Sequence, residues 1–194
     1  MLFRSLNNFG AVNIRATDIL TTVLEAFGSI WPGRVLVGSV NLGDVWRHSL
    51  IAGEGETKGL VPFHKLSQWM TYSLFEPLEW AGCKITHVEE MTGLPEYRNG
   101  GLLIDMGVLV PVKADALNQE YAPSDEFIVE WRALTVALLD VIGDSVREAL
   151  GKTPEELPLA KVLQGGTWAA GRKIAAKLRK DGGSPVKKIG RAHV

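Results

Sequence analysis

One segment constrains the fold more than any other: residues 125–150, DEFIVEWRALTVALLDVIGDSVREAL. This run contains no proline, and it is apolar nearly all round from Phe127 to Ile142. That pattern predicts a long helix with much of its surface buried. Such a helix needs other elements to cover it, and the remaining apolar periodicities are also helical. The sequence therefore predicts a mainly α-helical fold.

Further helices are predicted for residues 16–30, 62–81, 86–94, 155–163 and 167–180. Thr17 or Asp18 is expected to cap the first of these. Pro62 suits the first turn of the second, and Pro77 should kink that helix or end its first part. The alternating stretch RVLVGSV within residues 34–46 leaves room for at most a small β element.

The helix predicted at 62–81 has two different stripes of side chains. The stripe expected to be buried consists of Leu66, Met70, Ser73 and Leu74. The stripe expected to be polar consists of Lys65, Gln68 and Tyr72.

The composition is that of an ordinary globular protein. The 194 residues fit one domain, and a net charge of −1 gives no bulk attraction to nucleic acid or to an anionic membrane. Cys83 is the single cysteine, so a reducing, cytoplasmic compartment is expected. No apolar stretch approaches the roughly 20 residues that span a bilayer. Metal-ligand and nucleotide-loop motifs are absent from the sequence, so neither a metal nor a cofactor is predicted.

The two ends of the sequence carry an unusual signature. MLFRS at residues 1–5 and IGRAHV at residues 189–194 correspond to translations of opposite strands of a common sequencing adapter, the first with GTG read as a start codon. We expect both ends to be adapter read-through, with a single domain over residues 6–188. On this hypothesis the natural gene extends upstream of residue 6 and past residue 188.

Polar side chains gather at the start of the apolar segment GLPEYRNGGLLIDMGVL, residues 93–109. Glu96, Tyr97 and Arg98 stand side by side there, and they serve either as a turn that caps the next element or as part of a ligand pocket. Glu130 and Arg132 interrupt the apolar run of the long helix. Burying such charges is costly unless they are paired. They form either a salt bridge within the core or part of a pocket, and in the pocket their candidate partners are Glu96 and Arg98.

Two segments have the composition of anion sites. His64, Lys65 and Gln68 lie at the N-terminal end of their helix, which makes them either an anion site or a solvated first turn. GGTWAAGR at 165–172 reads as a helix start, whose backbone amides and Arg172 could approach a phosphate.

Several long strings together resemble the uracil-catabolism family of fungi and bacteria, sometimes labelled as related to uracil phosphoribosyltransferase. They are GDVW, LVPFHKLSQWMTYSLFEPLEWAG, GLPEYRNGGLLIDMGVL, EWRALTVALLD and LPLAKVLQGGTWAAGR. The resemblance covers most of residues 16–185. It implies the C-terminal half of a protein about twice this length.

A more distant resemblance is to the queuosine salvage proteins, which hydrolyse the N-glycosidic bond of queuosine 5′-phosphate. The shared blocks are Lys65 with Gln68, the turn 96–98 with GVL at 107–109, and Glu130 with Arg132. This resemblance implies a helical fold similar to helix–hairpin–helix DNA glycosylases. Here the acidic residue of the turn is Glu rather than Asp, and Asn99-Gly100 replaces Val-Pro, which leaves the substrate open.

The second resemblance implies an N-glycosidase that splits a ribosyl 5-phosphate compound, such as N-ribosylurea 5-phosphate, to urea and ribose 5-phosphate. Glu96 and Lys65 are the predicted catalytic residues. The Glu96 carboxylate would stabilise the oxocarbenium-like state of the sugar, and Lys65 would hold that carboxylate or the ribose phosphate. The predicted substrate-binding residues are His64, Gln68, Trp69, Tyr97, Arg98, Glu130, Trp131, Arg132 and Arg172.

Three other functions are compatible with parts of this pattern. A phosphoribosyltransferase normally has an α/β fold with an acidic pair and a glycine-rich phosphate loop after a strand, and the sequence has neither. A non-catalytic nucleotide-binding subunit would bind without turnover. A nucleic-acid glycosylase follows from fold analogy alone, and the absence of a basic stripe counts against it. The predicted partner is a small-molecule substrate.

Overall fold

The computed structural model describes residues 12–31 and 35–189. The predicted adapter residues at 1–5, all but the first residue of 189–194, and residues 32–34 of the WPGR turn lie outside the described residues. Within the described ranges the fold is mainly α-helical, as the sequence predicts, and the strands pair only in two-stranded sheets. The same ranges contain no helix with the length and apolar character needed to cross a bilayer.

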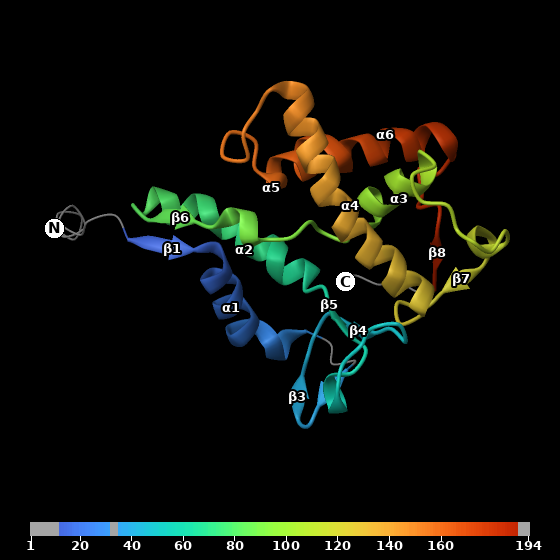
Figure 1. Ribbon diagram of the computed structural model, residues 1–194, viewed down its shortest axis with the longest axis horizontal. Helices are drawn as coiled ribbons and strands as arrows, with labels where there is room; N and C mark the ends of the chain where they lie inside the picture. Colours follow the sequence, from blue (N-terminus) through green and yellow to red (C-terminus); the bar gives the residue numbers. More distant parts are fainter. Residues whose placement is uncertain (1–11, 32–34, 190–194) are drawn as a thin grey trace.

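The helices form most of the structure (Figure 1). They are α1 Ala16–Phe27, α2 Lys65–Trp80, α3 Tyr97–Asp105, α4 Glu126–Leu150, α5 Leu159–Lys161 and α6 Trp168–Leu178. A π-helix, η6 Val162–Thr167, joins α5 to α6 without a break. Short 3-10 turns occur at Gly28–Ile30, Gly55–Thr57, Val88–Glu90 and Ala116–Asn118.

The strands act as short ties between distant parts of the chain. Two pairs are parallel: β1 Asn13–Arg15 with β6 Lys84–Thr86, and β7 Glu120–Tyr121 with β8 Lys187–Lys188. Two pairs are antiparallel: β2 Leu36–Val37 with β3 Val40–Asn41, and β4 Val45–Arg47 with β5 Leu60–Pro62. The small β element predicted within residues 34–46 is thus the β2–β3 hairpin and the start of β4.

Helix α4 is the long helix that the sequence predicts over 125–150, and it runs through the middle of the view in Figure 1. The negative charge of Glu126 in the first turn and the positive charge of Arg147 in the last turn stabilise the helix by interacting with its dipole. The helix ends at Gly151, which is in the left-handed conformation at φ 60°. The burial that its apolar run predicts is confined to part of its surface. One face is buried, through residues such as Val129 and Leu139, while Val141 on another face is 59% exposed.

Helix α2 corrects the sequence prediction in its start and in its buried face. Pro62 belongs to strand β5, and the helix begins after His64, whose φ of 47° lies in the left-handed region. Pro77 lies in the last turn and the helix continues to Trp80. The buried residues are Ser67, Gln68 and Thr71 rather than the predicted apolar stripe. They can be buried because their polar groups have partners inside the chain.

Three other helix predictions are corrected. Arg15, not Thr17 or Asp18, occupies the N-cap of α1, and no side chain caps it. The helix predicted at 86–94 is only a 3-10 turn, because His87 is left-handed at φ 55° and the chain then becomes extended. The helices predicted at 155–163 and 167–180 are one continuous helical run from Leu159 to Leu178 through η6.

Helices α3 and α6 approach each other closely, and Gly171 makes this possible. A Cβ atom at Gly171 would lie 2.2 Å from the carbonyl oxygen of Arg98, so the two backbones leave no room for a side chain. Gly100, on the other side of α3, similarly faces Trp131 and Thr135 of α4 at less than 3 Å. The three helices α3, α4 and α6 therefore pack through glycines.

We expect Gly171→Ala to lower the free energy of unfolding by about 1–3 kcal/mol, because the methyl group forces α3 and α6 apart. Gly165→Ala is the matched control, since a Cβ there meets nothing within 4 Å. That variant should be neutral or gain up to about 1 kcal/mol. Urea denaturation of both variants measures the difference. Equal losses in the two variants would contradict the close-contact argument.

Candidate functional site

A cavity of about 420 Å³ lies between α2, the start of α3 and the η6–α6 junction. This volume is typical of small-molecule sites. Its lining is mostly apolar and aromatic, with a few polar groups. The residues that line it are Trp69, Tyr72, Ser73, Phe75, Glu76, Leu94, Glu96, Asn99, Ala160, Leu163, Gln164 and Trp168.

Glu96 is the buried carboxylate of this cavity, with 7% of its surface exposed. It occupies the N-cap of α3, and its Oε2 accepts a hydrogen bond from the backbone N–H of Arg98 at 2.7 Å. Both interpretations of residues 96–98 therefore hold for Glu96: it caps the next helix and it lines a pocket. The cap bond holds the carboxylate at the N-terminus of α3.

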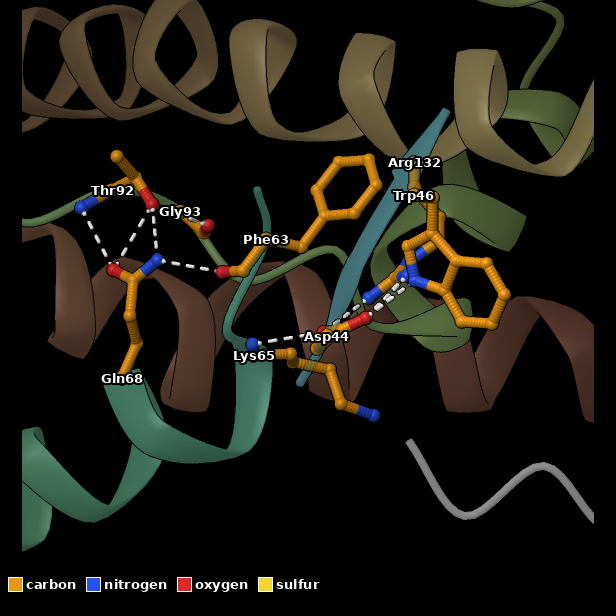
Figure 2. Close-up of polar contacts among 8 residues, drawn as sticks. All are labelled: Asp44, Trp46, Phe63, Lys65, Gln68, Thr92, Gly93 and Arg132. Carbon is orange, nitrogen blue, oxygen red and sulfur yellow. Dashed lines mark hydrogen bonds and ion pairs between the residues drawn. The ribbon is translucent and has the colours of Figure 1, made fainter. Parts of the chain in front are cut away.

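Gln68 holds the segment that leads to Glu96 (Figure 2). Its Nε2 donates to the carbonyl of Phe63 at 3.1 Å and to Oγ1 of Thr92 at 2.8 Å, and its Oε1 accepts from the N–H of Thr92 at 3.2 Å. Tyr72 of the same helix donates its hydroxyl to the carbonyl of Thr92 at 3.1 Å. Burial raises the pKa of Tyr72, with a smaller contribution from Asp140, so its hydroxyl stays a donor at neutral pH. Helix α2 and residues 92–96 are thus tied together.

Asn99 ties the opposite wall. Its Nδ2 donates to the carbonyl of Leu94 at 3.2 Å, and its Oδ1 accepts from the hydroxyl of Thr167 at 2.9 Å. Both residues are buried, and Thr167 ends the π-helix η6. These bonds connect the start of α3 to η6, so the cavity wall is fixed on both sides of Glu96.

Asp44 forms a second polar cluster, at the N-terminus of α2 (Figure 2). Arg132 binds both of its carboxylate oxygens, at 2.9 and 2.8 Å, and both side chains are about one-tenth exposed. Asp44 Oδ1 also accepts from Trp46 Nε1 at 2.7 Å, and Oδ2 accepts from the backbone N–H of Lys65 at 3.1 Å. Arg132 in addition lies 4.1 Å from the ring of Phe63. The cluster joins α2, α4 and strand β4.

The Asp44 carboxyl is charged because its partners outweigh its burial. Burial raises its pKa, but the hydrogen bonds and charge of Arg132, with smaller contributions from Trp46 and the Lys65 N–H, lower it below its ordinary value. Burial lowers the pKa of the neighbouring His64, only partly opposed by Asp44, so that ring is neutral at pH 7. The anion at this helix N-terminus is therefore the protein's own carboxylate, and His64 brings no positive charge to it.

The structure separates the residues that the sequence groups into one site. Glu96 and Trp69 line the cavity together with Trp168. Arg172 does not line it, but its guanidinium lies 4.9 Å from the ring of Trp168. His64, Lys65, Gln68 and Arg132 are not among the lining residues. Arg132 forms the core salt bridge that is the first of its two interpretations, with Asp44 as its partner. Arg98, the candidate partner in the second interpretation, donates to the carbonyl of Gly182 at 2.5 Å.

Two further predicted residues belong to another cavity, of about 360 Å³, next to the chain that follows α3. Glu130 is exposed there, and Trp131 is buried with its Nε1 donating to the carbonyl of Gly100 at 3.1 Å. Tyr97 is 38% exposed, and the guanidinium of Arg98 lies 4.8 Å from its ring. Trp131 thus serves first to pack α4 against α3.

The predicted helix start at 165–172 is also corrected. Residues 165–167 lie inside η6, so no free helix N-terminus exists there to receive a phosphate through backbone amides. The π-helix instead places Leu163, Gln164 and Trp168 on the cavity side. Leu163 and Trp168 are five positions apart, which is the hydrogen-bond spacing of a π-helix, and π-turns inside α-helices often accompany functional sites.

Sequence reasoning missed several residues of the site. The sequence singles out none of Asp44, Glu76, Asn99 and Trp168 as a site residue, and it places Tyr72 on a stripe expected to be polar. One signal was available: Trp69, Tyr72, Ser73 and Glu76 follow the spacing i, i+3, i+4, i+7, which puts them on one face of α2. Within the described residues no group of three or more His, Cys, Asp or Glu side chains has the arrangement of a metal site.

Comparison with known proteins assigns the chain to a family. Residues 1–191 match the family model described as "Protein of unknown function (DUF1688)". The chain is 46% identical over 160 residues to "Protein urg3" of Schizosaccharomyces pombe, which covers 81% of this chain and 39% of that protein. It is 37% identical over 198 residues to "Uracil catabolism protein 4" of Lachancea kluyveri, which covers 91% of this chain and 44% of that protein.

The chain thus spans less than half the length of these two relatives. No solved structure matches it. The similarity predicted from the strings of residues 16–185 is confirmed, and the chain belongs to the DUF1688 family of proteins, whose members include relatives named for uracil catabolism.

Proposed function

We propose that this chain acts in uracil catabolism as an N-glycosidase on a ribosyl 5-phosphate compound. The similarity to "Uracil catabolism protein 4" supports the pathway. The chemistry is supported by one observation above the others: a buried carboxylate, Glu96, is fixed in a cavity with aromatic walls. The proposal includes a helical arrangement similar to that of helix–hairpin–helix DNA glycosylases.

The reaction proposed is the hydrolysis of N-ribosylurea 5-phosphate. The bond between C1 of the ribose and the urea nitrogen breaks, water adds its oxygen to C1, and a proton passes to the urea nitrogen, which leaves urea and ribose 5-phosphate. Positive charge develops on the sugar as that bond opens. The Glu96 carboxylate stabilises this charge and orients the attacking water.

The aromatic side chains and Arg172 supply binding in this proposal. Trp69 and Trp168 offer flat surfaces on which the leaving group stacks. Arg172 is exposed beside Trp168, so its guanidinium can pair with the 5-phosphate at the edge of the cavity. Lys65, predicted to hold the carboxylate or the phosphate, is not among the lining residues, whereas Trp69 lines the cavity. Arg172 lies outside the lining as well, but its guanidinium is 4.9 Å from the ring of Trp168, which lines the cavity.

The mainly helical fold disfavours the phosphoribosyltransferase alternative. Those enzymes rely on a phosphate loop after a strand of an α/β sheet, and the described residues contain only two-stranded sheets. A non-catalytic subunit would bind the substrate but not hydrolyse it, so an assay that detects both binding and product distinguishes this alternative from the proposed enzyme.

The proposal is tested by incubating the purified chain with N-ribosylurea 5-phosphate and following the mixture by proton NMR. Dispersed methyl signals of the protein in the same spectrum establish that the sample is folded. Growth of the ribose 5-phosphate anomeric signals is the expected result. Shifted substrate signals without product would instead indicate a binding subunit. Loss of substrate that requires added pyrophosphate, with urea and 5-phosphoribosyl 1-pyrophosphate as products in place of ribose 5-phosphate, would indicate a phosphoribosyltransferase.

A further inference from the structure

The cavity around Glu96 has a lining suited to positive charge. Its wall contains four aromatic side chains, three from α2 and one from the start of α6, and two carboxylates, Glu76 and Glu96. No lysine, arginine or histidine is found among the described residues that line it. Aromatic ring faces and carboxylates both attract cations, and both repel anions.

We infer that this cavity is a recognition site for an organic cation, which in the proposed reaction is the ribose ring as it becomes positively charged. Glu76 is the residue that this inference adds to Glu96, Trp69 and Trp168, and no sequence pattern singles it out. The inference rests on the proposed function and deepens it, because it names the charge that the site selects. It also places the phosphate of a ribosyl 5-phosphate outside the cavity, where Arg172 lies over the ring of Trp168 at 4.9 Å.

Side chains from two helical segments face the cavity from opposite sides. On α2 the residues Trp69, Tyr72 and Glu76 share one face, and Tyr72 contacts Phe75 edge to face with 5.6 Å between the ring centroids. On the other side the π-helix η6 brings Trp168 to the cavity. The tie between Gln68 and Thr92 on one side and that between Asn99 and Thr167 on the other fix the two walls around Glu96. A preformed box of this kind needs little reorganisation to receive a cation.

A matched pair of probes isolates the effect of charge. 1,4-Dideoxy-1,4-imino-D-ribitol is a ribose-shaped ring with a protonated nitrogen, and 1,4-anhydro-D-ribitol has an uncharged oxygen at the same place. Calorimetric titration of the chain at pH 7 should show the cation binding at least tenfold more tightly than the ether. Glu96→Gln and Glu76→Gln should each reduce that ratio, and Trp168→Leu should reduce it while keeping an apolar wall. Glu79→Gln, an exposed residue of α2 outside the cavity, should leave it unchanged.

A second measurement needs no variant. Raising the pH above the pKa of the ring nitrogen neutralises the probe, so the preference of the wild-type chain should disappear there. Equal affinity for the two probes, tighter binding of the ether, or no binding of either overturns the inference. Cation-selective binding without hydrolysis of N-ribosylurea 5-phosphate would retain the inference and refute the proposed function. Hydrolysis of N-ribosylurea 5-phosphate without a preference for the cation would support the proposed function and refute the inference.

Discussion

Glu96→Gln is expected to slow the release of ribose 5-phosphate from N-ribosylurea 5-phosphate by roughly 10²–10⁴-fold, the range for loss of a positioned acid–base group. That loss corresponds to about 3–5 kcal/mol of barrier at 1.4 kcal/mol per tenfold. The amide keeps an oxygen that can accept the hydrogen bond from the N–H of Arg98, so α3 keeps its cap. Only the negative charge is removed.

The rate is measured by the anomeric proton signals, and the variant's stability by thermal unfolding. Glu79→Gln makes the same chemical change on α2, at an exposed position outside the cavity, and should keep the wild-type rate. A folded Glu96→Gln chain that turns over as fast as the Glu79→Gln chain would remove Glu96 from the mechanism.

Asp44→Ala is expected to lower the free energy of unfolding by about 3–5 kcal/mol, because it leaves the charge of Arg132 buried without its partner. It also removes acceptors from Trp46 Nε1 and from the first N–H of α2. The double variant Asp44→Ala with Arg132→Met takes away the stranded charge and fills its space with an apolar chain. It should be more stable than Asp44→Ala alone.

The effect of Asp44 has a defined pH dependence. The folded pKa of its carboxyl lies below the ordinary value, so its stabilisation is fully present above the unfolded pKa of about 3.9 and is lost as the pH falls through the folded pKa. Urea denaturation of wild type and Asp44→Ala between pH 7 and pH 2 should show two curves that converge in acid. A gap that stays constant over this range would show that Asp44 acts through packing and not through its charge.

The sequence predicts elements better than it predicts contacts, and Gln68 and Asp44 show why. Helices α1, α2 and α4 follow from local periodicity, which a single chain displays directly. Gln68 looks like a surface residue on the same evidence. Its burial depends on Thr92, 24 positions away, and nothing in the local pattern reports that partner. Asp44 meets Arg132 across 88 positions, so the sequence shows two isolated charges where the fold has one ion pair.

The same contrast between local patterns and contacts of distant residues holds for the candidate site. Glu96 and Trp69 were found because their neighbours form distinctive strings, and both line the cavity. Two arguments place Lys65 with them: a helix N-terminus attracts anions in general, and Lys65 with Gln68 resembles a block of the queuosine salvage proteins. Only the first argument applies to His64. The structure fills that N-terminus with Asp44, an acidic residue from a loop that local reasoning had no cause to place there. Trp168 was missed because GG before it reads as a helix start, whereas the chain continues through a π-helix.

The π-helix η6 also bears on how this family can vary. Such a segment holds one residue more than an α-helix of the same rise, so losing Gly165 or Gly166 would convert it to regular helix with all backbone bonds kept. After that loss Leu163 and Trp168 would be four positions apart, which is about one turn of an α-helix, so Trp168 would remain on the same face as Leu163. A single-codon deletion here is therefore expected to preserve both the fold and the aromatic wall of the cavity, whereas a deletion inside a regular α-helix rotates all later residues by about 100°. Members of the family that lack one of these glycines are expected to keep a tryptophan at the cavity.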